Sequence, residues 1–392
     1  MLLEKILKKS VLSLALVCAV PGMAMADIKI GFLGTLSGPS AANGRDQLDG
    51  FRLALDQLDG KLGGVKTEIV AEDDQMKPSV ALTGVSRLLE REDVDAVVGL
   101  TFTHVLMALQ PKIAETDVPF IGTISGPSPT AGALCKPNLF IMSWQSDAPA
   151  EAMGKYMQDK GVKTISTLTP NFVGGKDKIS GLRNTYKGEI IDEIYTPLSQ
   201  LDFSAELTQV ALSDPEGVFM FYPGGLGVTF MRQYKQAGLA GKLPLYTANS
   251  IEGEDVDAMG EAVIGAYAAD TWTPGISSEY SKQFVNAYRE KYNRTPSAYA
   301  AFSYDAMMKL NAAVEALKGD VSDKKAFVKA IKTADFESVR GDFKFGNNNY
   351  PVQDYHIFEM VEGENGKPDW KLVQENVLKD HVDSYAAQCT MS

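Results

Sequence analysis

Residues 95–127, DAVVGLTFTHVLMALQPKIAETDVPFIGTISGP, contain two apolar runs that each end in hydroxyl side chains. The first run ends in Thr-Phe-Thr (101–103), the second ends in Thr-Ile-Ser-Gly (123–126), and a helical pattern lies between them. In a parallel sheet the loops after the strands gather at one edge, where open α/β folds bind ligands and helix N-termini favour anions. This stretch therefore predicts a pocket for a carboxylate.

The same alternation of short apolar runs and amphipathic helical stretches continues on both sides. We expect strands at 28–33, 68–72, 164–168, 190–195, 218–222, 245–248 and 266–273, and helices at 46–58, 78–91, 147–160, 176–186, 204–212, 228–236, 278–292, 298–317 and 324–333. At 139–144 we expect the chain to leave the first unit. Short β segments are expected at 342–345, 355–360 and 370–373. The repeated βαβ units indicate an α/β protein with two halves, each holding a mostly parallel sheet covered on both faces.

Two helix starts carry specific predictions. Pro111 lies inside the helix expected at 104–116, and an interior proline costs roughly 3 kcal/mol unless the helix kinks. We therefore expect a kinked helix, or one that begins near Gln110. At the start of the second half, we expect the Asp147 side chain to cap the helix that follows it.

Residues 1–26 have the pattern of a secretory signal. A lysine-rich start precedes an apolar run at 11–20, which is too short to span a bilayer stably, and a small-x-small motif ends at Ala26. Cys18 follows the bulky Val17, which favours cleavage after the motif over a lipoprotein anchor. We expect the mature chain to be soluble and exported to the periplasm.

The formal net charge is −12, or −14 without the signal. This charge argues against nucleic acid and anionic membrane surfaces as partners, because both reward clustered Lys and Arg. Cys135 and Cys389 are the only cysteines after the signal, and export makes a disulfide between them plausible. Two separate buried thiols are the alternative. A bond would tie the C-terminal tail to the region between the two halves.

Catalytic chemistry finds little support in the sequence. His104, His356 and His381 have no metal-binding spacing, and no Gly-x-Ser-x-Gly elbow occurs. We expect no metal, no cofactor and no enzyme activity. A periplasmic hydrolase that uses Ser37 or Ser125 is the rival hypothesis, and turnover of esters or amides that is lost on changing either serine would support it.

An ordered set of short motifs runs along the chain: Ile28-Lys29-Ile30-Gly31, Leu36-Ser37-Gly38-Pro39, Asp73-Asp74, Val118-Pro119-Phe120, Asp202-Phe203-Ser204, Phe221-Tyr222-Pro223-Gly224-Gly225 and Gln236-Ala237-Gly238-Leu239. Each motif is weak alone, but the order is specific. In this order the chain resembles the type I periplasmic binding proteins of ABC importers, in the leucine/isoleucine/valine-binding group. The resemblance covers residues 27 to about 380.

The resemblance implies two Rossmann-like α/β lobes joined by three crossings, with the ligand in the cleft between them. Lobe 1 is expected at 27–143 plus 274–346, and lobe 2 at 144–273 plus 347–392. Ligand would stabilise the closed form, which an inner-membrane ABC permease would recognise. We expect a monomer. A protein that presents its ligand to a sensor would have the same sequence features, because a sensor also recognises the closed form.

The resemblance also assigns the carboxylate site. Thr103 aligns with the family position whose hydroxyl holds the ligand carboxylate, and the segment that adds polar contacts comprises Ile124, Ser125 and Gly126. Hydroxyl and backbone N–H donors at strand ends can hold an anion without a buried cation. In the alternative reading, Thr101 and Thr103 are loop hydroxyls and helix caps.

The opposite end of the expected pocket departs from amino-acid binders. Asn249 stands where we would look for the acid that pairs with an ammonium, and Asn43 replaces a tyrosine common after the Ser-Gly-Pro turn. Aromatic side chains at expected strand ends suggest flat apolar walls: Phe102, Trp144, Phe172, Tyr222 and Trp272. Each of them could instead be ordinary core or hinge packing.

These features predict a small carboxylate as ligand, of the benzoate or hydroxybenzoate type, with a ring substituent bonded by Asn43 or Asn249. A branched-chain or other aliphatic amino acid is the alternative. Further candidate contacts are Ser37, Arg45 and the free N–H groups around Pro223, Gly224 and Gly225. Arg45 could reach the carboxylate or simply solvate the first helix. The glycines lack the fuller fingerprint of a nucleotide site.

Overall fold

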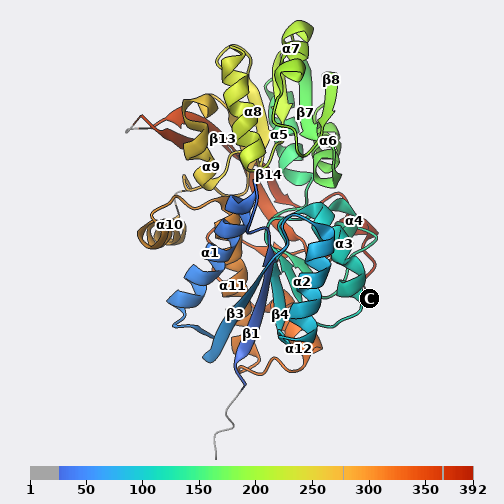
Figure 1. Ribbon diagram of the computed structural model, residues 1–392, viewed down its shortest axis with the longest axis vertical. Coiled ribbons are helices and arrows are strands. Elements are labelled where there is room, and N and C mark those ends of the chain that lie inside the picture. The colour runs from blue at the N-terminus through green and yellow to red at the C-terminus, as the bar shows by residue number, and fades with distance from the viewer. Residues whose placement is uncertain (1–25, 277, 364–365, 392) are drawn as a thin grey trace, which may run out of the picture.

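A computed structural model describes residues 26–276, 278–363 and 366–391 of the chain. The expected signal segment, apart from Ala26, lies outside the described residues. The described chain forms two α/β lobes that are stacked along the long axis of the molecule (Figure 1). Within these residues, no helix combines the length and the apolar composition that crossing a membrane requires. The predicted fold class, two lobes with mostly parallel sheets, is confirmed.

Lobe 1 contains a six-stranded sheet in the order β2-β3-β1-β4-β5-β6. Its strands are β1 (Ile28–Gly34), β2 (Lys61–Leu62), β3 (Val65–Asp73), β4 (Ala96–Gly99), β5 (Phe120–Gly122) and β6 (Leu139–Ile141). All neighbours in this sheet are parallel except the β2–β3 hairpin. Strands β4 and β5 thus lie side by side, and the loops that follow them meet at the same edge of the sheet, as the sequence predicts.

Helices cover both faces of this sheet because successive strand side chains point to opposite sides. In β1, Phe32 packs with the cluster that includes helices α1 (Ala41–Gln57) and α11 (Ala298–Ala316), whereas Leu33 packs with α2 (Pro78–Glu90) and α3 (Thr103–Ala114). A Cβ on Gly50 would overlap the Ala300 carbonyl, so this glycine lets α1 and α11 approach closely. Helices α4 (Ser128–Ala131), α10 (Glu279–Tyr292) and α12 (Lys324–Thr333) complete the helical set of this lobe.

Lobe 2 repeats the architecture with the strand order β12-β13-β11-β10-β9-β7-β8, and β14 pairs with β13. Its strands are β7 (Thr164–Pro170), β8 (Glu189–Thr196), β9 (Gly217–Met220), β10 (Leu245–Ala248), β11 (Tyr267–Asp270), β12 (Lys344–Phe345), β13 (Pro351–Glu362) and β14 (Pro368–His381). Helices α5 (Ala148–Asp159) and α6 (Val173–Thr185) lie on one face, and α7 (Ser204–Ser213), α8 (Gly225–Gln236) and α9 (Gly253–Met259) lie on the other. The sheet is parallel from β8 to β11 and antiparallel beyond.

Two helix starts differ from the predictions. Helix α3 is continuous from Thr103 and runs through Pro111, whose side chain is exposed, so the alternative start near Gln110 is wrong. Asp147 precedes α5, but its side chain makes no cap hydrogen bond and instead accepts from Gln145 Nε2 at 2.9 Å. The backbone of Asp147 is already helical (φ −73°, ψ −36°), whereas a cap residue is extended, and Pro149 removes one of the two N–H donors that a cap would serve.

The chain crosses between the lobes after β6, after β11 and before β13, and Arg340 joins the first of these segments to β13 and to α11. Its guanidinium donates to Asp305 Oδ2 at 2.9 Å, to the Met142 carbonyl at 2.7 Å and to Gln353 Oε1 at 2.9 Å. It also lies over the ring of Phe302, 4.8 Å from the centroid. The arginine and Asp305 side chains are only 3% and 0% exposed, so this is a buried ion pair within the hinge.

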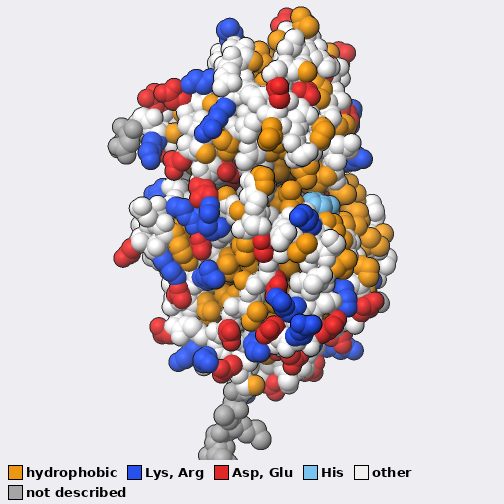
Figure 2. Space-filling view, in the orientation of Figure 1, with side chains coloured by type: hydrophobic (Ala, Val, Ile, Leu, Met, Phe, Trp, Pro, Cys, Tyr) orange, Lys and Arg blue, Asp and Glu red, His pale blue; other side chains and the backbone are white. Residues whose placement is uncertain are grey.

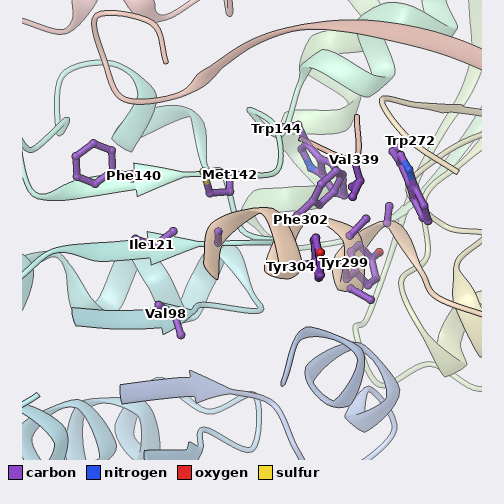
Figure 3. Packing of buried hydrophobic residues seen from close by; sticks show 14 of the residues in the cluster. Val98, Ile121, Phe140, Met142, Trp144, Trp272, Tyr299, Phe302, Tyr304 and Val339 are labelled. Carbon is purple, nitrogen blue, oxygen red and sulfur yellow. The ribbon is translucent and has the colours of Figure 1, made fainter. Parts of the chain in front are cut away.

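The core continues through this junction (Figure 3). The Trp144 ring meets the Phe302 ring edge-on, with the centroids 5.0 Å apart, and Val339 lies beside them. Trp272 is fully buried nearby, where its indole N–H donates to Ser281 Oγ at 2.9 Å. Aromatic packing therefore fixes the segments about which the lobes would rotate.

Cys135 and Cys389 form the expected disulfide, with their Cα atoms 5.7 Å apart and a sequence separation of 254. The tail around this bond lies against the chain before β13, where Asn347 Nδ2 donates to the Ala386 carbonyl at 2.8 Å. Asn348 Nδ2 likewise donates to Asp383 Oδ2 at 2.8 Å. The bond thus holds the C-terminal tail against lobe 1, between the loop before β6 and the chain before β13.

Replacing both cysteines by alanine is expected to lower the free energy of unfolding by about 2–4 kcal/mol, because the bond closes a long loop in the unfolded chain. Urea titration of the oxidised wild-type protein and the double variant measures the difference. The wild-type protein titrated under reducing conditions is the control and should match the variant. A double variant as stable as the oxidised protein would contradict the prediction.

Candidate functional site

A small, partly open pocket lies between the lobes, where the loops after the parallel strands of both sheets face each other. It is lined by Asn43, Thr101, Phe102, Thr103, Ile124, Ser125, Trp144, Ser146, Phe172, Gly174, Lys178, Phe221, Pro223, Asn249 and Tyr299. On the face shown in Figure 2, hydrophobic side chains gather along the line where the lobes meet. The cavity is small, with a volume of about 40 Å³.

Most residues that the sequence proposes for the site lie together in this pocket. They are Asn43, Thr101, Phe102, Thr103, Ile124, Ser125, Trp144, Phe172, Pro223 and Asn249. They come from α1, from the loops after β4, β5, β7, β9 and β10, and from the first crossing. The prediction that two adjacent strands of lobe 1 end at one pocket is therefore confirmed, while the role of each residue in ligand binding stays a prediction.

Several proposed residues of lobe 1 lie elsewhere. Ser37 is exposed in the turn before α1. Arg45 is half-exposed and forms an ion pair with Glu254 of lobe 2, so it links the lobes outside the pocket. Gly126 packs under the Trp144 carbonyl, which a Cβ at this position would overlap. These residues position or bridge the lobes rather than line the pocket.

The aromatic and glycine candidates of lobe 2 are likewise corrected. Tyr222 is fully buried in the lobe 2 core, where its ring lies 4.9 Å from the Phe203 ring, because its side chain points to the face opposite the pocket. Trp272 belongs to the hinge core described above. Gly224 has φ +60° and precedes α8, and Gly225 faces the Pro39 carbonyl of lobe 1. Both glycines let lobe 2 approach lobe 1 closely, beside the pocket.

The three hydroxyls after β4 and β5 have different roles. The Thr101 hydroxyl is occupied, since it accepts from the Thr35 N–H at 3.1 Å and donates to Gln47 Oε1 at 2.7 Å. Thr103 Oγ1 and Ser125 Oγ are buried and have no hydrogen-bond partner among the described residues. A buried hydroxyl without a partner is costly, so both atoms are expected to meet an acceptor supplied by a ligand.

The walls of the pocket are aromatic. The Phe172 and Phe221 rings are stacked at 6.2 Å with an interplanar angle of 22°, and the Trp144 and Tyr299 rings lie 6.1 Å apart. Phe221 and Tyr299 are absent from the sequence-based set, as is Ser146. The alternation of side chains along β9 predicts Phe221, because its side chain points to the same face of the sheet as Phe219 and to the face opposite Tyr222.

Lys178 is the main residue that the sequence analysis missed, and it corrects the expectation of an anion site without a buried cation. Its side chain is buried in the pocket wall and donates to Asn249 Oδ1 at 2.7 Å. Burial lowers its pKa to about 7, against the opposing effect of Asp147, Asp270 and Asp177. The sequence holds one indication of this position: Lys178 follows Gly174 by four residues, so both lie on the same, buried side of α6.

Behind the pocket wall the polar contacts continue into a pair of buried carboxyl groups. Asn249 Nδ2 donates to Asp270 Oδ2 at 2.7 Å, so both ends of the Asn249 amide are occupied. Asp270 shares a hydrogen bond with Glu252, and burial raises the pKa of both, with Glu252 well above its ordinary value. One proton is therefore held between them. Glu252 Oε2 also accepts from the Ala298 N–H of lobe 1 at 3.0 Å.

A second group of charges joins the lobes outside the pocket. Arg294 Nη1 contacts Asp46 Oδ1 at 2.7 Å and Glu254 Oε2 at 3.3 Å, which links α1 of lobe 1 to α9 of lobe 2. Asp255 is buried in the first turn of α9. Burial, with Glu254 and Asp46 nearby, raises the pKa of Asp255 to about 7.

Asp255→Asn is expected to stabilise the protein at pH 8 but not at pH 4. A carboxyl with a raised pKa in the folded state stabilises the fold only when protonated, so this contribution is lost as the pH rises from about 4 to about 7. We expect a gain of roughly 1–3 kcal/mol at pH 8, measured by urea unfolding at both pH values. The exposed Asp257→Asn in the same helix should change little. An equal gain at both pH values would exclude this titration as the cause.

The geometry gives no support to the rival hydrolase hypothesis. A serine nucleophile needs a base within hydrogen-bond reach, and Ser125 Oγ has no such partner among the described residues. His104 is turned away from the pocket, with Nε2 at 3.1 Å from the Met76 carbonyl. Within the described ranges, no group of three or more His, Cys, Asp or Glu side chains is placed to hold a metal ion.

Comparisons with known proteins agree with this architecture. A family model described as "Periplasmic binding protein" matches residues 27–367. Among curated proteins, the chain is similar to the Leu/Ile/Val-binding protein homolog 6 of Brucella melitensis. The two are 25% identical over 374 residues, which cover 92% of this chain and 94% of the relative.

Two solved structures of comparable identity contain different ligands. One is the solute binding protein of an ABC transporter from R. palustris in complex with benzoate, which is 27% identical with a TM-score of 0.88 and covers 93% of this chain and 100% of that chain. The other is the branched-chain amino acid transporter substrate binding protein LivJ from Streptococcus pneumoniae in complex with isoleucine. It is 26% identical with a TM-score of 0.79, covering 89% and 100% of the two chains. The ligand of this chain must therefore be argued from its own pocket.

Proposed function

Because this chain belongs to the periplasmic binding protein family, as a solute-binding protein of the leucine/isoleucine/valine-binding type, we propose that it binds a small aromatic carboxylate and delivers it to an ABC permease. Family membership implies a periplasmic location and a membrane permease as partner. One observation supports the ligand class: two buried hydroxyls, Thr103 Oγ1 and Ser125 Oγ, have no hydrogen-bond partner among the described residues and line a pocket walled by aromatic rings. These hydroxyls would hold the carboxylate, and the rings would enclose the aromatic ring.

The charges around the pocket favour an aromatic acid over an amino acid. An amino acid brings an ammonium group, which needs an acidic partner when it is buried. In the part of the chain that the structure describes, no Asp or Glu lines the pocket, and the one charged lining residue is Lys178. A second cation next to this lysine would be repelled whenever the lysine is protonated, whereas a benzoate has no ammonium to satisfy.

Closure of the lobes would couple binding to delivery. We place lobe 1 at 27–143 plus 274–346 and lobe 2 at 144–273 plus 347–392. The strands of the two sheets support most of this division, since β1 to β6 fall in the first set and β7 to β11, β13 and β14 fall in the second. Strand β12, at the end of the range 274–346, pairs with β13 of the lobe 2 sheet, which puts this boundary a few residues earlier. A ligand held by lobe 1 hydroxyls and lobe 2 rings would bridge both lobes and favour the closed form.

A ligand screen tests the proposal. Thermal unfolding of the purified mature protein with benzoate, 4-hydroxybenzoate, leucine and isoleucine is expected to show stabilisation by the benzoates only, since a ligand that binds the native state stabilises it by RT ln(1 + [L]/Kd). Calorimetry then gives each Kd. Tight leucine binding with no response to either benzoate would replace this proposal by amino-acid transport.

The transport role has its own test. Deleting the gene is expected to abolish high-affinity uptake of the ligand found in the screen. Normal uptake combined with a lost chemotactic or transcriptional response would instead indicate a protein that presents its ligand to a sensor. Mass spectrometry of the exported protein is expected to give a chain that begins at Asp27, as cleavage after Ala26 requires.

A further inference from the structure

We infer that closing the lobes takes up a proton, at carboxyl groups that the first turn of α9 in lobe 2 brings against α1 in lobe 1. As a result, the protein binds its ligand more tightly as the pH falls below neutral. This inference rests on the proposed function, because it assumes that the ligand stabilises the closed form. It adds a pH dependence that comes from the contact between the lobes and not from the ligand pocket.

The first turn of α9 is packed directly against lobe 1. A Cβ on Gly253 would lie 2.7 Å from Asp46 Oδ2 and 2.9 Å from the Ser297 Cβ, so the missing side chain lets the two lobes meet here. The preceding residue, Glu252, accepts a hydrogen bond from the Ala298 N–H at the start of α11, at 3.0 Å. In Figure 1, α9 lies next to the upper end of α1, across the line where the lobes meet. These contacts form when the lobes close and break when they separate.

The contact gathers more acidic than basic groups. Six carboxyl groups and two guanidinium groups meet there, together with two phenols: Asp46 and Asp49 of α1, Glu252, Glu254, Asp255 and Asp270 of lobe 2, Arg45, Arg294, Tyr288 and Tyr299. Carboxylates that are buried together resist ionisation, because each loses water and gains negative neighbours. Closing the contact with every carboxyl group ionised is therefore unfavourable, and a bound proton removes part of this cost.

Asp255 and Glu252 are the groups that we expect to hold the proton. Both are buried, and within the described part of the chain neither forms an ion pair. Burial, together with Glu254 and Asp46, raises the pKa of Asp255 to about 7. Burial, together with Asp270 and Asp46, raises the pKa of Glu252 well above its ordinary value. Because Asp46 belongs to lobe 1, separating the lobes removes part of both shifts.

The direction of the pH effect follows from these pKa values. A carboxyl group whose pKa is higher in the closed form than in the open form favours closing at low pH. For Asp255 this contribution is fully present below the pKa of the open form, near the ordinary value of about 4. It is lost as the pH rises through the pKa of the closed form, about 7. Between these two values, closing takes up close to one proton.

The test is calorimetry of the mature protein with benzoate, in two buffers with different heats of ionisation. The dependence of the binding heat on the buffer gives the number of protons taken up. At pH 6 we expect about one proton per benzoate, and we expect a Kd about fivefold or more higher at pH 6.5 than at pH 5.5. Benzoate is ionised in this range, and Lys178, with a pKa of about 7, is mostly protonated. No proton uptake by the wild-type protein would overturn the inference.

Two variants locate the proton. Asp255→Asn and Glu252→Gln keep the size of the side chain but cannot take up a proton, and at least one of them is expected to lower the uptake by half or more. Asp257→Asn, at an exposed position of the same helix, is the matched control and should keep the wild-type value. Uptake that is unchanged in both Asp255→Asn and Glu252→Gln would place the proton elsewhere and overturn the inference. The wild-type count decides the question even if a variant folds poorly.

A failure of the proposed function gives a different result. If neither benzoate nor 4-hydroxybenzoate binds but leucine or isoleucine does, the aromatic ligand class is wrong. The same proton count with that amino acid then decides the inference, because the contact at α9 depends on closing and not on the ring of the ligand. Absence of binding by all four compounds would overturn both.

Discussion

Thr103→Val is expected to weaken the binding of benzoate-type ligands by about 10- to 100-fold, because a hydrogen bond to a charged group contributes about 1.5–3 kcal/mol. The same change should leave the ligand-free protein as stable as wild type or slightly more stable. The reason is that Thr103 Oγ1 is buried without a partner, and valine has the same shape without the hydroxyl. Calorimetry and urea unfolding measure the two effects, which run in opposite directions.

Thr103→Ser keeps the hydroxyl and is the control, so it should retain most of the affinity. Thr101→Val provides a contrast, since the Thr101 hydroxyl bonds the Thr35 N–H and Gln47 within the protein. That variant should lose stability. If Thr103→Val binds as tightly as wild type, the carboxylate is held elsewhere in the pocket.

Arg340→Met is expected to lower the free energy of unfolding by about 3–5 kcal/mol, because it leaves the Asp305 carboxylate buried without its partner. It also removes the donors to the Met142 carbonyl and to Gln353, which join the crossings. Urea titration gives the loss, and near-ultraviolet circular dichroism reports on the aromatic packing at the hinge. No other single substitution considered for this chain should destabilise the fold as strongly.

Arg87→Met is the matched control for this prediction. Arg87 forms an ion pair with Glu72, but its side chain is 54% exposed, and such pairs contribute about 0–1 kcal/mol. The double variant Arg340→Met with Asp305→Leu should recover part of the loss, because it removes the unpaired charge. A loss below 1 kcal/mol for Arg340→Met alone would show that the hinge does not depend on this pair.

The sequence predicts the fold well because two patterns are clear along the chain: short apolar runs, typical of buried strands, and the 3.6-residue hydrophobic period of amphipathic helices. Alternation of buried strands with amphipathic helices depends on local composition, and parallel pairing follows from it. Thr103 and Ser125 could be placed in one pocket for the same reason, since each follows a strand and β4 lies beside β5. Local pattern and sheet topology suffice for this half of the site.

The lobe 2 side of the site, together with Tyr299, depends on side-chain direction and on packing between residues far apart in the sequence. The aromatic pattern suggests Tyr222 instead of Phe221 as a pocket residue. The two-residue period of the strand, however, places the Tyr222 side chain in the lobe 2 core with Met220. Tyr299 reaches the pocket from the start of α11, which no local pattern places near β4. Lys178 was overlooked because lysines are almost never fully buried, and only the assembled lobes show what surrounds this one.

The disulfide between Cys135 and Cys389 has a consequence for the way the molecule can open. The crossings of the chain lie together, so alone they would let the lobes both bend toward each other and twist about the long axis. The bond ties the tail after β14 to the loop before β6 in lobe 1, and so adds a connection between the lobes besides the crossings. We expect it to resist the twist and to leave the bend free. Opening and closing then follow a single coordinate, and a permease would need to sense one angle to distinguish an empty protein from a loaded one.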